Sequence, residues 1–132
     1  MPLYQDSVAE EMAYVIDHCS ARFIVAQDQE QVDKIIEVKD KLPGVEQIIF
    51  LDPRGMRKYD RTSLTDYKAL QMRGRDEEAK HRPELEKRLA RQSGANTCAM
   101  LYTSGTTGRP KGVVLSNDNT VSYTHLTLPT KA

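Results

Sequence analysis

The sequence has few cysteines, no excess of either charge and no long apolar run. Its 19 basic and 19 acidic side chains cancel, so electrostatics favours neither nucleic acid nor an anionic membrane as a partner. No stretch approaches the roughly 20 apolar residues that cross a bilayer, and the N-terminus lacks a basic region followed by an apolar core. We therefore expect a cytoplasmic protein, at most peripheral to a membrane.

Metal-binding and disulfide patterns are also absent. The two cysteines, Cys19 and Cys98, lie within apolar patterns and are interpreted as buried free thiols rather than as a disulfide or a metal site. His18, His81 and His125 are isolated, with no carboxylate or cysteine at metal-ligand spacing. We expect surface or helix-end roles for these histidines and no metal site.

What is present fits one globular α/β domain. A length of 132 residues, 39% of them hydrophobic and 29% charged, suffices to bury roughly two thirds of the unfolded surface. Ser7 and Glu10 form the pattern of a capping box that opens a first helix. The apolar positions of that helix recur at helical spacing: Val8, Met12, Val15, Ile16 and Cys19.

Strand and helix patterns then alternate. A short apolar run at 23–26 predicts a buried strand, and Asp28 with Gln31 can cap a second helix that Pro43 and Gly44 end. Residues 45–51 predict the next strand, followed by a turn. Two strands alternating with two helices imply a right-handed βαβ unit with a parallel sheet.

The middle of the chain is rich in charge. After a charged connector at 56–62, Ser63 and Asp66 predict the start of a short helix that closes near Gly74. Pro83 suits the first position of another helix, which ends near Gly94. Acidic and basic residues are interspersed here, which indicates a solvated face. We expect residues 96–102 to re-enter the sheet.

The most informative stretch is residues 102–112, YTSGTTGRPKG, which lies between two apolar runs. This pattern predicts strand, loop, strand. Glycines let the backbone approach a ligand closely, while exposed N–H groups, hydroxyls and a lysine favour a polyphosphate. The expected ligand-binding residues are Thr103, Ser104, Gly105, Thr106, Thr107, Gly108 and Lys111.

Other readings of this stretch are weaker. A Walker A loop counted from Gly105 would need a glycine where Pro110 stands, and no Ser or Thr follows Lys111. Ser104 lies in SGTTG rather than GxSxG, which disfavours a hydrolase nucleophile. Arg109 is expected to face solvent. The alternative is that this Gly/Ser/Thr-rich stretch is an ordinary surface loop with no ligand.

The run YTSGTTGRPKGVVLS resembles the phosphate-binding signature of the adenylate-forming, or AMP-binding, superfamily of acyl-CoA synthetases, firefly luciferases and peptide-synthetase adenylation domains. Upstream, PLYQDSVAEEMAYVIDH, FIVAQDQEQVDKI and IIFLDPRGMRKYD resemble bacterial long-chain fatty-acid CoA ligases. The resemblance covers nearly all of residues 2–119. It implies a partial βαβ parallel-sheet subdomain from the large N-terminal domain of such an enzyme.

The resemblance also implies a reaction. In that family a carboxylate attacks the α-phosphate of ATP·Mg²⁺ to give an acyl-adenylate, and CoA then displaces AMP. ATP, Mg²⁺, CoA and a fatty acid are the implied small-molecule partners, with no nucleic acid and no protein partner indicated. The seven residues named above would hold ATP phosphates, and no catalytic residue of the family falls within the chain. We therefore expect the chain to be inactive alone.

Three alternatives stay open. The parent enzyme could be an aryl-CoA ligase or a peptide-synthetase adenylation domain, and the chain could be a non-catalytic nucleotide-binding module. Many relatives carry a histidine after the second strand, whereas Ser116 is followed here by Asn117 and Asp118, which leaves the acyl specificity open.

The expected domain is residues 1–120. Residues 121–132 resemble a translated sequencing adapter and are interpreted as a non-native tail.

Overall fold

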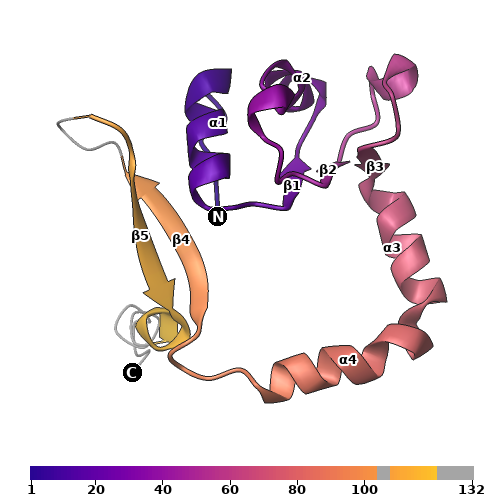
Figure 1. Ribbon diagram of the computed structural model, residues 1–132. Helices are drawn as coiled ribbons and strands as arrows, with labels where there is room; N and C mark the ends of the chain where they lie inside the picture. Colours follow the sequence, from indigo (N-terminus) through magenta and orange to yellow (C-terminus); the bar gives the residue numbers. More distant parts are fainter. Residues whose placement is uncertain (104–107, 122–132) are drawn as a thin grey trace, which may run out of the picture. The chain divides into compact units, whose positions relative to one another are not determined.

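The computed structural model describes residues 1–103 and 108–121 (Figure 1). These residues form two compact units: one comprises residues 3–81, and the other comprises residues from Arg82 onward together with Met1–Pro2. The first unit is a parallel sheet with helices, and the second contains an antiparallel hairpin. The α/β fold predicted from the sequence is confirmed.

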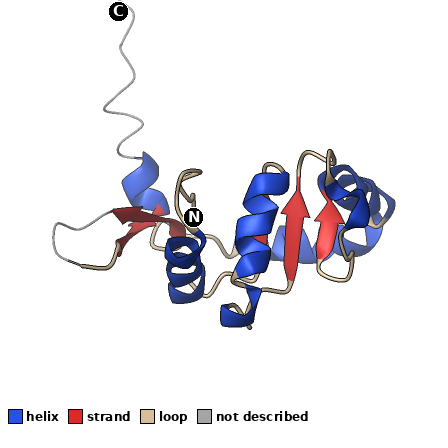
Figure 2. Ribbon diagram, turned by 90° about the horizontal axis from the view of Figure 1, so that it is seen from above, coloured by secondary structure: helices blue, strands red, loops and turns tan. Residues whose placement is uncertain are grey.

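The sheet of the first unit has three parallel strands in the order β1-β2-β3. β1 (Phe23–Ala26) pairs with β2 (Gln47–Phe50), which pairs on its other side with β3 (Leu64–Asp66). Figure 2 draws these strands as red arrows. The predicted βαβ unit is therefore present, with β2 as its central strand.

Two helices bury the sheet on one face. α1 (Ala9–His18) turns Met12, Ile16 and neighbouring small residues inward, and α2 (Gln29–Glu37) contributes Val32 and Ile35. They meet Ile48 and Phe50 of β2 in one cluster, in which the Phe50 side chain has no exposure. Burying side chains of this size contributes about 1.5–3 kcal/mol each.

The helix ends partly follow the prediction. Asp28 caps α2 by accepting a hydrogen bond from the Gln31 amide at 3.2 Å, as expected. The prediction of a capping box at Ser7 and Glu10 is wrong, because Val8 is the N-cap of α1 and makes no side-chain capping bond. α2 also ends at Glu37, before the predicted Pro43 and Gly44. A 3₁₀ turn at Lys39–Lys41 follows, after which the Leu42 side chain enters the core.

The charged middle of the chain departs most from prediction. Leu64–Asp66 is a strand rather than the first turn of a helix, because pairing with β2 satisfies its backbone and buries Leu64. Asp66 caps the helix that follows, α3 (Tyr67–Asp76), by accepting from the amides of Lys68 and Ala69. Gly74 lies inside α3, where a glycine costs only about 1 kcal/mol relative to alanine.

Pro83 lies inside α4 (Glu78–Ala90) rather than at its first position. A proline there removes one backbone hydrogen bond. Side-chain pairs four residues apart, Glu77 with His81 and Glu84 with Arg88, support the helix on either side of it. Neither α3 nor α4 has a buried residue, in agreement with the predicted solvated face.

The second unit holds β4 (Thr97–Thr103) and β5 (Lys111–Ser116), paired antiparallel as a separate two-stranded sheet. Both strands of the predicted strand-loop-strand pattern are confirmed, whereas residues 104–107 between them lie outside the described residues. The expectation that residues 96–102 re-enter the parallel sheet is wrong for the described residues, because β4 pairs with the strand that follows it. Local pairing of this kind needs no crossover helix.

Both cysteines are free thiols, but neither is buried. Cys19 is half-buried after α1, and Cys98 is exposed at an irregularity where the β4–β5 register shifts between Thr97 and Ala99. The prediction of buried thiols is therefore wrong. An extra residue at a β-bulge falls out of the ladder, which explains the exposure of Cys98.

Ser20 adopts a left-handed backbone with φ of 53°, and it is the one non-glycine residue with a positive φ among the described residues. Its amide donates to the Asp17 carbonyl and the Ala21 amide to the Ile16 carbonyl, which ends α1 in a Schellman motif. Glycine is the usual residue at that position, since a Cβ strains the left-handed region.

We expect Ser20→Gly to raise the free energy of unfolding by about 0.5–1 kcal/mol, because it removes the strain of the left-handed Cβ. Ser20→Ala keeps the Cβ and is the matched control, with no gain expected. Urea denaturation of the three proteins measures both changes. Equal stabilisation by alanine and glycine would show that strain at Ser20 is not the cause.

Candidate functional site

The candidate site is the end of the β4–β5 hairpin, where Thr103 closes one strand and Lys111 opens the other. These residues are direct cross-strand partners, and both are exposed. Directly opposed residues of an antiparallel pair project from the same face, so the Thr103 hydroxyl and the Lys111 ammonium lie on one side of the hairpin. The remaining predicted loop residues, Ser104, Gly105, Thr106 and Thr107, lie outside the described residues.

The backbone conformation at Gly108 explains why this predicted site residue is a glycine. Its φ of 112° lies in the region that side chains with a Cβ rarely adopt, and an added Cβ would meet no heavy atom of the described residues within 4 Å. The glycine is therefore required by conformation rather than by space. Arg109 beside it is exposed, in agreement with its predicted solvent-facing role.

The base of the hairpin is held by polar contacts that the sequence did not reveal. The Asn117 amide donates to the Asn96 carbonyl, and the Asp118 amide donates to the Gly94 carbonyl, each at 3.0 Å. An added Cβ at Gly94 would lie 1.9 Å from the Asp118 carboxylate. The Asn117 side chain adds a bond of its own, because its amide group donates to the Ser93 carbonyl at 2.9 Å.

The carboxyl end of the parallel sheet is a second place where a ligand could bind, since ligands of open α/β sheets bind outside that edge. The polar groups there satisfy one another. Arg54 pairs with Asp52, its N–H groups lowering the pKa of that carboxyl. Gln29 donates to the Tyr59 hydroxyl at 2.8 Å, and Tyr59 in turn donates to Asp33 at 2.5 Å. These side chains bond to one another and stabilise the fold.

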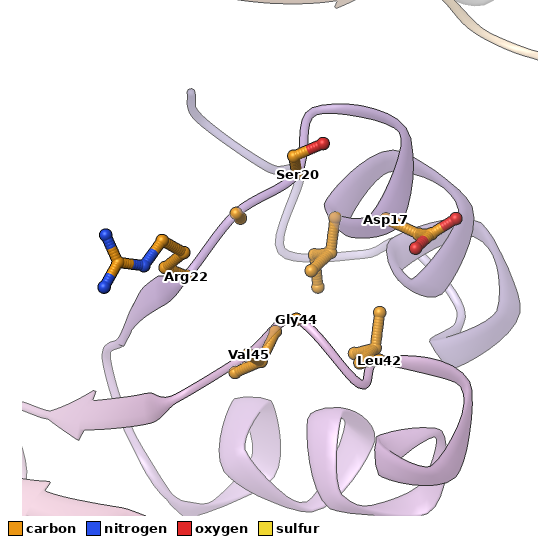
Figure 3. A pocket seen from close by; sticks show the side chains of 8 residues that line it. Asp17, Ser20, Arg22, Leu42, Gly44 and Val45 are labelled. Atoms are coloured by element: carbon orange, nitrogen blue, oxygen red, sulfur yellow. The ribbon is translucent and has the colours of Figure 1, made fainter.

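One cavity of about 290 Å³ opens beside the end of α1 (Figure 3). Leu42, Gly44 and Val45 line its wall, while the Arg22 guanidinium points away from it in Figure 3. Arg22 is paired with Glu46, whose carboxylate raises the arginine pKa. Ligand sites combine an apolar wall with a few convergent polar groups. Asp17 and Ser20 also line this cavity, but in Figure 3 their oxygen atoms and the Arg22 guanidinium point in different directions, so the polar groups do not converge.

The histidines and acidic residues form no metal centre in the part of the chain that the structure describes. His18 packs its ring 5.5 Å from that of Tyr14, and His81 lies 2.9 Å from the Glu77 carboxylate, which lowers the pKa of Glu77. His125 lies outside the described residues. Among residues 1–103 and 108–121, no helix has the length and apolar character needed to cross a membrane.

The family profile and the similar sequences point to the same protein family. The profile of the family described as AMP-binding enzyme matches residues 1–131. A long-chain-fatty-acid–CoA ligase of Xenopus laevis, ACSBG2, is 37% identical over 117 residues, which cover 89% of this chain and 15% of that protein. The long-chain-fatty-acid–CoA ligase FadD15 of Mycobacterium bovis is 29% identical, covering 92% of this chain and 18% of the relative. The chain thus spans less than a fifth of these relatives.

A solved structure shares the fold. The crystal structure of the anthranilate CoA ligase AuaEII in complex with anthranoyl-AMP superposes with a TM-score of 0.57, covering 87% of this chain and 19% of that one. The sequence identity is 20%, so the likeness concerns the fold alone.

The Tyr59–Asp33 contact gives a pH-dependent prediction. The hydrogen bond to Asp33, aided by burial, raises the pKa of the Tyr59 phenol above its ordinary value. The native chain therefore holds this proton more tightly than the unfolded chain does. The resulting stabilisation is fully present below about pH 10 and is lost as the pH rises through the folded pKa.

We expect Asp33→Asn to lower the Tyr59 pKa, because the negative charge beside the phenol is removed. An NMR titration of the Tyr59 Cζ carbon measures the change. Asp76→Asn, an equal change of charge on the exposed part of α3, is the matched control. A Tyr59 pKa that is the same in Asp33→Asn as in the unmodified chain would contradict the assignment.

Proposed function

Because the chain belongs to the AMP-binding enzyme family, we propose that it is the part of a long-chain fatty-acid CoA ligase that holds the phosphates of ATP. The observation that carries the proposal is the exposed Lys111 ammonium directly opposite Thr103, on the two strands that flank the Gly/Ser/Thr loop. The similarity to relatives named long-chain-fatty-acid–CoA ligases supports the acyl class.

The chemistry of the hairpin end suits a polyphosphate. An exposed lysine is a strongly hydrated point charge that binds phosphate oxygens without a fixed geometry. A hydroxyl on the same face adds a hydrogen bond, and hydrogen bonds to charged groups contribute about 1.5–3 kcal/mol. In this proposal Lys111 and Thr103 bind the outer phosphates, and Gly108 lets the backbone turn close to them, with Ser104, Gly105, Thr106 and Thr107 as further donors.

In the proposed reaction, the hairpin acts by positioning. Holding the β and γ phosphates places the α-phosphate in line with an attacking fatty-acid carboxylate, and fixed donors stabilise the charge on the departing pyrophosphate. CoA then displaces AMP from the acyl-adenylate. The described residues offer no cluster for Mg²⁺, so the ion enters here only as a companion of ATP. We propose a cytoplasmic, at most membrane-peripheral, location.

An aryl-CoA ligase is the second candidate function. The observation in its favour is the structural likeness to an anthranilate CoA ligase, at an identity of 20%. The greater sequence identity to the long-chain ligases, up to 37%, favours the fatty-acid proposal. A peptide-synthetase adenylation domain and a non-catalytic nucleotide-binding module have no observation of this kind in their support.

Removing the lysine charge tests the phosphate assignment. We expect Lys111→Met to weaken pyrophosphate binding about tenfold, because one charge-assisted hydrogen bond is lost. Titration of the chain with magnesium pyrophosphate, followed by ³¹P and ¹H–¹⁵N NMR, gives the dissociation constants. Lys87→Met is the matched control, since Lys87 is also exposed but lies on α4. If both variants bound pyrophosphate equally weakly, the loss would reflect the net charge of the chain rather than a contact of Lys111, and the proposal would be refuted.

The isolated chain should bind without turning over. We expect no pyrophosphate release from ATP and palmitate by the 132-residue chain, because none of the residues carried over from the family is catalytic. A coupled pyrophosphate assay measures the release, with full-length ACSBG2 of Xenopus laevis as the positive control. Turnover comparable to that of the full-length relative would show that the chain itself contains the catalytic groups.

A further inference from the structure

The cross-strand pair next to Thr103 and Lys111 consists of Tyr102 and Gly112. The Tyr102 ring lies across the glycine: an added Cβ at Gly112 would lie 3.1 Å from the ring carbon Cζ and 3.3 Å from both Cε1 and the hydroxyl oxygen. The φ of Gly112 is outside the positive region, so its backbone does not require a glycine. A larger side chain at position 112 would therefore clash with the Tyr102 ring, although the backbone conformation there would allow it.

This contact lies on the face of the hairpin opposite to Lys111. Side chains alternate along a strand, so Tyr102 and Met100 share one face, while Thr103 and Leu101 share the other. The Tyr102 hydroxyl donates to the Met100 sulfur at 3.5 Å, in agreement with this arrangement. Tyr102 is half-buried, whereas Leu101, Val113 and Val114 are 39–55% exposed. Few buried contacts hold the hairpin by other means.

The pairing register of β4 on β5 is weakly specified in a hairpin with so few buried side chains. A slip of one residue moves every side chain of a strand to the other face, and weakly buried or glycine-containing strands are prone to it. The β4–β5 ladder already contains one shift, between Thr97 and Ala99. An aromatic ring packed across a glycine of the partner strand is a known means of pinning register.

We propose that Tyr102, packed across Gly112, is a positioning residue that fixes the register of β4 on β5 and so keeps the Lys111 ammonium on the face of Thr103. The consequence for phosphate binding rests on the function proposed above. The register itself does not, and it can be measured without any ligand.

Replacing the ring tests the proposal. Tyr102→Thr keeps a good strand former but removes the ring, whereas Tyr102→Phe keeps the ring and removes only the hydroxyl. We expect the threonine variant to lose the ring-current shift of the Gly112 Hα protons and the NMR contact between Thr103 and Lys111. Its affinity for magnesium pyrophosphate should fall about tenfold, as for loss of the lysine contact. The phenylalanine variant should retain all three properties, with an affinity within about twofold.

Two further variants separate positioning from general stability. Leu101→Thr is the matched control on the opposite face and should leave the Thr103–Lys111 contact and the affinity unchanged. In Gly112→Ala the new methyl group displaces the ring, so we expect the register contact and the affinity to be lost, although alanine is otherwise tolerated better than glycine in a strand. This variant decides the question if Tyr102→Thr leaves the hairpin unfolded.

The outcomes distinguish this inference from the proposed function. An intact Thr103–Lys111 contact in both Tyr102→Thr and Gly112→Ala would overturn the positioning role. If the unmodified chain fails to bind pyrophosphate, the proposed function is refuted, while the ligand-free NMR measurements still decide the role of Tyr102.

Discussion

The central strand β2 is the constraint on which the first unit depends. Among the strands of residues 1–103 and 108–121, it alone is paired on both sides, and its alternation directs Ile48 and Phe50 into the core while α1 and α2 cover that face. Interiors pack as tightly as organic crystals, so a fully buried Phe50 leaves little freedom in how the helices lie on the strands. Arg61 lies over the Phe50 ring at 4.9 Å and donates to the Met56 carbonyl, which closes the core at that edge.

The other face of the same sheet is open in this chain. On β1, Phe23 and Val25 are 57% and 61% exposed, although strands of parallel sheets are normally buried on both faces. The buried packing of this sheet therefore comes from the face that α1 and α2 cover.

The hairpin is stabilised differently from the core. Its base is tied by backbone hydrogen bonds from Asn117 and Asp118, and its far end by the packing of Tyr102 on Gly112, with exposed apolar side chains between them. Local polar and aromatic contacts therefore replace a buried core in determining where Lys111 lies. A site built in this way is sensitive to single contacts, because no large packed surface compensates for the loss of one of them.

Several elements could be predicted from short stretches of the sequence, because their signals are local. These are strand β1, the Asp28 cap of α2, the βαβ alternation and the strand-loop-strand pattern around Lys111, because apolar periodicity, capping side chains and glycines act over a few residues. The folded chain was needed to show that Leu64–Asp66 pairs with β2, that β4 pairs with β5 rather than with the parallel sheet, and that Tyr102 lies across Gly112. Apolar periodicity within one segment does not specify which strand it pairs with or which side chain it packs against, because both depend on the neighbours that meet it in space.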